Sequence, residues 1–139
     1  MIRLSLILLA FAIAFPASAQ ETVLGAKQAR AFIAGKIFGY RCFDGTTGIG
    51  RIDHDGSVAG TIRPGEDKPS RYIRLPVNTV YESGDQICAT LRGARFSPCF
   101  TITKTSHNSF RGAIAGLGFM YCDFVRGGRP IVAGRKTKK

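Results

Sequence analysis

Two histidines are the residues best suited to acid–base chemistry. His54 stands between two aspartates in the run Asp53-His54-Asp55, and His107 lies in a polar run at 105–109. A carboxylate beside an imidazole can form an acid–base pair. However, neighbouring residues of a strand point to opposite faces, which argues against direct contact between His54 and either aspartate. We therefore interpret both histidines as solvated turn residues.

The motifs of common enzyme classes are missing from the chain. The run GSVAG at 56–60 has its serine one place too early for a nucleophile elbow. No metalloprotease, EF-hand, phosphate-loop or dinucleotide fingerprint occurs. Glu66 and Asp67 lie together in a proline-flanked loop, which is typical of solvated acids and not of a glycosidase pair. No catalytic residue, metal or cofactor is predicted, and an enzyme assembled across strands stays a minor alternative.

Four cysteines, Cys42, Cys88, Cys99 and Cys122, indicate two structural disulfides, because an even cysteine count in a small domain is typical of bridged cysteines when the N-terminus carries the export signal described below. Cys88 and Cys99 flank residues 93–94, where a two-residue hairpin would place them directly opposite each other. Cys42 then pairs with Cys122, a bridge that would tie the first strand to the last and help close a barrel. The chain has no CxxC and no cysteine near a histidine, so redox and metal roles are disfavoured.

Basic residues outnumber acidic ones by 20 to 9, giving a net charge of +11. Residues 126–139 are expected to form a flexible tail that attracts anionic surfaces, and its basic members are Arg126, Arg129, Arg135, Lys136, Lys138 and Lys139. Within the domain, we predict a cationic strand face able to bind phosphate or carboxylate, built from Arg71, Arg74 and Arg111. The alternative for both sets is solubilising charge without a partner.

The rest of the chain reads as one helix followed by short strands between glycine turns. Apolar residues in 22–35 share one helical face, which predicts a short helix that stops at Gly35. Strands are predicted at 37–43, 48–54, 57–63, 70–76, 79–83, 85–91, 98–104, 109–115 and 118–125. Asp55-Gly56 suits a two-residue type I′ hairpin. The pattern predicts a mainly β fold: a small antiparallel meander of about eight strands, barrel or sandwich, with one short N-terminal helix.

The N-terminus has the features of a secretory signal peptide. Arg3 precedes an apolar stretch at 4–15, and Ala17-Ser18-Ala19 follows the small-x-small cleavage rule. The apolar stretch is shorter than the roughly 20 residues needed to span a bilayer. We expect cleavage after Ala19 and a periplasmic or secreted protein. The predicted organisation is a signal peptide at 1–19, a single β domain at 20–125 and the basic tail at 126–139.

Several runs resemble a family of small exported alphaproteobacterial proteins of uncharacterised function. These runs are AGK at 34–36, FGYRCFDG at 38–45, ESGDQICATL at 82–91 and PCF at 98–100. The resemblance covers 22–125 and implies a periplasmic β domain without assigned activity. The family's usual Gly-Thr-Trp before the cysteine hairpin is replaced here by the residues at 78–81.

A fainter likeness is to the C-type lysozyme inhibitors, small barrels in which a Tyr-x-Cys strand is bridged to a late cysteine. Tyr40-Arg41-Cys42 and Cys122 match that outline. The inhibitory Ser-Gly-x-Arg-Tyr loop is reduced here to Arg71-Tyr72, so the inhibitory residues are not carried over.

These observations predict an exported, non-enzymatic protein that binds anionic cell-envelope components. Lipopolysaccharide phosphates, acidic polysaccharide and a phospholipid surface are the expected classes of ligand. The alternative is a protein-type inhibitor of an envelope-attacking hydrolase such as lysozyme. Nucleic acid is disfavoured as the main partner, because the chain carries an export signal and no nucleic-acid-binding motif.

Overall fold

A computed structural model describes residues 14–18 and 20–129 of the chain. Most of the expected signal peptide, including its cleavage residue Ala19, lies outside the described residues. Four members of the expected tail, Arg135, Lys136, Lys138 and Lys139, also lie outside them.

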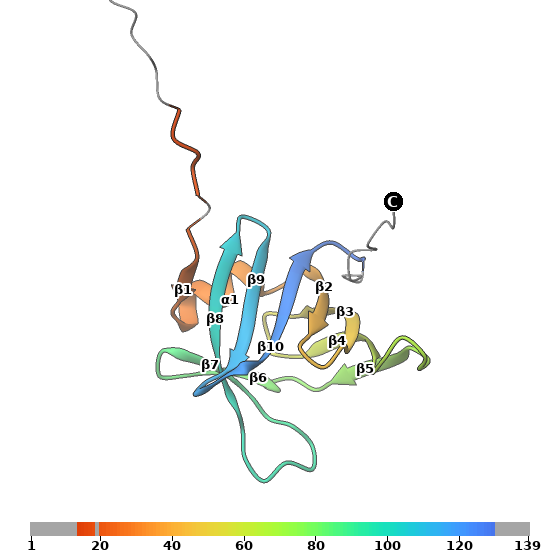
Figure 1. Ribbon diagram of the computed structural model, residues 1–139. Helices are drawn as coiled ribbons and strands as arrows, with labels where there is room; N and C mark the ends of the chain where they lie inside the picture. The colour runs from red at the N-terminus through yellow and green to blue at the C-terminus, as the bar shows by residue number, and fades with distance from the viewer. Residues whose placement is uncertain (1–13, 19, 130–139) are drawn as a thin grey trace, which may run out of the picture.

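The described chain folds into one antiparallel sheet of ten strands and one short helix, α1 (Ala26–Ile33), as Figure 1 shows. The strands are β1 (Thr22–Leu24), β2 (Ile37–Cys42), β3 (Thr47–Ile52), β4 (Val58–Arg63), β5 (Arg71–Leu75), β6 (Val80–Ser83), β7 (Gln86–Ala89), β8 (Cys99–Ser106), β9 (Ser109–Ile114) and β10 (Leu117–Arg126). The predicted mainly β fold with one short helix is confirmed.

The sheet consists of two meanders that meet at its centre. Its strand order is β5-β4-β3-β2-β10-β9-β8-β7-β6, and β1 pairs with β8 outside this path. The pairing of β2 with β10 joins the meanders, with Cys42 opposite Cys122 and Phe38 opposite Arg126. The sheet curls into a half-barrel whose edge strands are β5 and β6.

The predicted helix over 22–35 is shorter in the structure, because its first residues form a strand. Thr22 and Val23 are β-branched residues, which favour strands, and β1 pairs antiparallel with β8. At Gly25 the chain turns into α1, and the Gly25 N–H donates to Gln28 Oε1 (3.2 Å). The helix ends before Gly35, whose φ of +75° suits glycine.

The core lies between α1 and the concave face of the sheet. Ala26, Ala29 and Ile33 of the helix pack on Phe38 and Phe110, together with Ile87 and Ile102. Phe110 stacks on Phe124 with ring centroids 4.4 Å apart and meets Phe38 edge-on at 5.1 Å. Small alanines let the helix approach the sheet closely, and each buried phenylalanine contributes about 1.5–3 kcal/mol.

Both expected disulfides are present, and Cys42–Cys122 ties the first predicted strand to the last as expected. Cys42–Cys122 joins the two central strands, so it fastens the meanders together and does not close the edges of the sheet. Cys88 lies opposite Cys99 as predicted. The segment between β7 and β8 is a loop over 90–98, and the two-residue hairpin predicted there was wrong.

Candidate functional site

The candidate acid–base residues lie in the turn between β3 and β4. The Asp53 N–H donates to the Ser57 carbonyl (2.9 Å) and the Gly56 N–H donates to the Asp53 carbonyl (3.0 Å). Gly56 has a φ of +79°, and no other residue of this turn has a positive φ. A type I′ turn needs positive φ at both central residues. The predicted two-residue hairpin is therefore wrong, and the strands are joined by a tight turn closed by a left-handed glycine.

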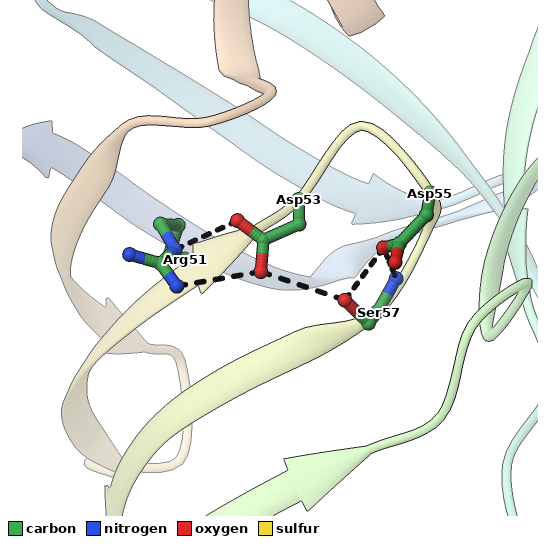
Figure 2. Close-up of polar contacts among 4 residues, drawn as sticks. All are labelled: Arg51, Asp53, Asp55 and Ser57. Atoms are coloured by element: carbon green, nitrogen blue, oxygen red, sulfur yellow. Dashed lines mark hydrogen bonds and ion pairs between the residues drawn. The ribbon is translucent and has the colours of Figure 1, made fainter.

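A polar network in this turn engages both aspartates (Figure 2). The Asp55 carboxylate accepts hydrogen bonds from the Ser57 backbone N–H (2.9 Å) and hydroxyl (2.6 Å), and these bonds lower the pKa of Asp55. Asp53 forms an ion pair with Arg51 (2.8 Å). The His54 carbonyl accepts a hydrogen bond from the Arg30 guanidinium on α1. These contacts shape the hairpin and dock it on the helix.

His107, the second histidine, is exposed in the turn between β8 and β9. Within 14–18 and 20–129, no group of three or more His, Cys, Asp or Glu side chains is placed to hold a metal ion.

The three arginines of the predicted cationic face do not lie on one continuous surface. Arg71 and Arg74 lie three residues apart on β5 and therefore point to opposite sides of the sheet. Arg111 is on β9, and four strands separate β9 from β5. Asp123 accepts two hydrogen bonds from Arg111 (2.7 and 2.9 Å), which raise the pKa of that guanidinium, and the group stacks on Tyr121.

The first residue of the expected tail belongs to the sheet. Arg126 is the last residue of β10, its N–H donates to the Asn108 carbonyl (2.8 Å), and its guanidinium lies 5.9 Å from the Phe32 ring centre. The Gly127 N–H donates to the Ile37 carbonyl (2.9 Å). Arg129 is exposed beyond these contacts. The sheet therefore extends past residue 125, where the domain was predicted to end.

One end of the half-barrel exposes a group of large apolar side chains. We call this end the open rim and define it as residues 43–46, 90–98 and 115–119. Its exposed apolar residues are 44–69% exposed and comprise Phe43, Leu91, Phe96, Leu117 and Phe119. Figure 1 shows the 90–98 loop extending from the end of the sheet where β9 finishes and β10 begins.

Contacts between the rim segments hold them at the same end of the sheet. The Ala115 N–H donates to the Cys99 carbonyl (2.9 Å), which places the β9–β10 turn beside the base of the 90–98 loop. The Phe43 N–H donates to the Tyr121 carbonyl (2.9 Å), and the Phe43 ring meets Phe119 edge-on at 6.5 Å.

The loop of the open rim also carries two exposed arginines, Arg92 and Arg95, between its apolar residues. The run LRGARF at 91–96 therefore places two cationic side chains among apolar ones on a projecting segment. The sequence prediction assigned residue 91 to a strand and 93–94 to a tight turn, so this feature was missed. The signal that could have found it is an apolar–arginine run without strand alternation between two bridged cysteines.

No known protein family, curated protein or solved structure matches this chain. No helix in the described part of the chain is both long and apolar enough to cross a membrane. The disulfides are typical of an oxidising compartment.

Proposed function

We propose that the chain is an exported, non-enzymatic protein of the periplasm that binds an anionic lipid surface of the cell envelope through the open rim. The observation that carries this proposal is the grouping of five exposed apolar side chains with Arg92 and Arg95 at one end of the sheet. Clusters of exposed apolar residues on small proteins mark interaction surfaces.

The composition of the open rim suits the boundary between lipid headgroups and acyl chains. Phenylalanine and leucine gain free energy when they enter the apolar side of that boundary, at about 25 cal/mol per Å² of buried apolar area. Arginines beside them remain at headgroup level and pair with phosphate oxygens, often through two hydrogen bonds. Each basic residue near such a surface contributes about 1 kcal/mol.

The basic tail is a second element of the proposal. Its residues are predicted to increase the attraction to anionic lipid without selecting an orientation, because their contribution is mainly charge. The open rim, by contrast, combines charge with apolar contact and therefore defines which end of the domain faces the lipid.

Co-sedimentation with vesicles tests the proposal. The full chain after signal removal is expected to bind phosphatidylglycerol-containing vesicles and to bind neutral phosphatidylcholine vesicles much less, with weaker binding at high salt. A chain ending at Gly127 separates the tail from the rim and is expected to keep measurable binding. Absence of binding to the anionic vesicles by the full chain would overturn the proposal.

An inhibitor of an envelope-attacking hydrolase is the second candidate function, and the shape of the 90–98 loop favours it. The loop projects from a base fastened by Cys88–Cys99, a shape that suits insertion into the cleft of another protein. This function predicts a stoichiometric complex with a C-type lysozyme by size-exclusion chromatography. That complex would be lost on substitution of Phe96 and retained in the presence of anionic vesicles.

A further inference from the structure

The concave side of the half-barrel contains a cavity of about 260 Å³. Its walls come from both meanders and from α1, and they include Ile33, Val58, Ile87, Phe110 and Phe124. Among the described residues that line it, none carries a charge. The Thr79 hydroxyl, the one side-chain hydroxyl in the lining, already donates to the Pro76 carbonyl (2.7 Å). Water therefore finds few hydrogen-bond partners there.

The size and character of this cavity indicate an apolar occupant. An engineered apolar cavity of about 150 Å³ stays dry and binds benzene, which has six carbons. At the same cavity volume per carbon atom, a cavity of about 260 Å³ accepts roughly ten hydrocarbon carbons. A ligand with polar groups along its length would leave them without partners, and that cost is large in a site of this kind.

The exposed part of the cavity lining lies at the open rim. Leu91 is 45% exposed and is the one exposed residue among the described residues that line the cavity. It is also the first apolar residue of the 90–98 loop. Arg92 follows it directly, and Arg95 lies three residues further along the same loop. A chain that enters past Leu91 therefore leaves its outer end beside cationic side chains.

We infer that the cavity binds the acyl chain, about ten carbons long, of a single-chain amphiphile whose anionic head group stays at Arg92 and Arg95. An unbranched chain meets the requirement for an apolar occupant, and a carboxylate or phosphate head complements the arginines. This inference rests on the proposed function for the source of the ligand, because lipid at the open rim would supply the chain.

Substitution of Gly112 gives a variant whose cavity is filled, and substitution of the neighbouring Ala113 gives its matched control. Gly112 lines the cavity, and a Cβ atom built there would lie 3.5 Å from Ile102 Cδ1 and 3.6 Å from Phe124 Cε2. A larger side chain at this position would therefore occupy the cavity. Ala113 is the next residue of β9 and points to the opposite face of the sheet.

Isothermal titration with decanoate and with decanoyl-lysophosphatidylglycerol tests the inference and distinguishes a free fatty acid from a lysolipid as source. The wild-type chain is expected to bind at least one of the two below its micellar concentration. Gly112→Leu should weaken that binding by about tenfold or more, whereas Ala113→Leu should leave it unchanged. Decanol, which lacks the charge, should bind more weakly than the anionic probe.

Ala89→Leu provides a second block from another wall, because Ala89 also lines the cavity and is 8% exposed. Circular dichroism identifies any variant that fails to fold. The inference is overturned if the folded wild-type chain binds neither probe, if decanol binds as well as the anionic probe, or if both folded blocked variants bind normally. Gly112→Leu keeps the open rim, so vesicle binding by this variant reports on the proposed function separately.

Discussion

The two ends of the half-barrel differ in how far their apolar side chains are exposed. At the helix end, which comprises α1 and the turns at 53–57 and 84–85, Ala26, Ala29 and Ile33 are at most 6% exposed. Contacts fasten this cover: the Ala26 N–H donates to Asp85 (3.2 Å), and Arg30 donates to the His54 carbonyl. At the open rim, no helix covers the sheet among the described residues, and Phe96 and Phe119 are 69% and 66% exposed.

Because the chain is able to cover apolar surface at its helix end, the exposure of the open rim needs another explanation. The same short chain covers its helix end with small residues and hydrogen-bonded turns. A projecting loop that combines phenylalanine, leucine and arginine has little to contribute to the stability of the domain. Its composition is better explained by contact with a partner, and the predictions below separate stability from binding on that basis.

Phe110 in the core and Phe119 in the open rim should differ most in their contribution to the free energy of unfolding. Phe110→Ala removes a ring that is 3% exposed and stacked on Phe124, so we expect the free energy of unfolding to fall by about 3–5 kcal/mol. Phe119→Ala removes a ring that is mostly exposed and should change it by less than about 0.5 kcal/mol. Urea unfolding measures both. Equal losses would contradict the distinction between a structural end and a binding end.

The two disulfides offer the next comparison. Removing Cys42–Cys122 by alanine substitution at both positions should cost about 4.5 kcal/mol, because the bridge closes a loop with a sequence separation of 80. Removing Cys88–Cys99, whose separation is 11, should cost about 3 kcal/mol. Chemical denaturation of both double variants tests this order. A greater loss from the pair at the base of the rim loop would show that this loop supports the fold.

Charge at the open rim should affect binding without affecting stability. Arg92→Gln with Arg95→Gln should weaken binding to anionic vesicles by about 2 kcal/mol, or roughly thirtyfold, at low salt. Arg71→Gln with Arg74→Gln removes the same charge from β5 and serves as the matched control. If the β5 pair causes the larger loss, the predicted strand arginines are the better candidates for the anion site.

The smallest expected effect is the pH dependence of stability. Hydrogen bonds from Thr46 and Ser57 hold the pKa values of Asp44 and Asp55 below their usual range. A lowered pKa adds stability above the unfolded value near pH 3.9, and this stability is lost as the pH falls through the folded pKa. The urea midpoint should therefore decrease slightly between about pH 5 and pH 3, with a flatter profile in Asp44→Asn and Asp55→Asn. A midpoint that rises on acidification would exclude this assignment.

The sequence was sufficient to predict the β class and the cysteine pairs, since strand spacing and cysteine position are local signals. It was insufficient for β1, because Thr22–Leu24 forms a strand only through its pairing with β8. The pairing of β2 with β10 at the centre of the sheet depends on tertiary packing, which the spacing of strands along the sequence does not reveal. The opposite orientation of Arg71 and Arg74, in contrast, follows from the two-residue period of a strand and could have been predicted.

The candidate site was harder to predict from the sequence than the fold. The open rim depends on three segments that are distant in sequence, and the cavity depends on walls from both meanders and α1. Taken one at a time, these apolar residues fall in or beside predicted strands and do not stand out in the sequence. Only the placement of the strand ends shows which of these residues are left exposed together.

The fluorescence of single tryptophans shows directly which end of the domain meets lipid, because the natural chain contains no tryptophan. Phe96 in the open rim and Tyr72 on β5 are both 69% exposed, so Phe96→Trp and Tyr72→Trp form a matched pair. On phosphatidylglycerol-containing vesicles, the emission of the Phe96→Trp variant should shift to shorter wavelength and be quenched by brominated acyl chains, while that of the Tyr72→Trp variant stays unchanged. A shift confined to the Tyr72→Trp variant would contradict the claim that the open rim is the end that binds lipid.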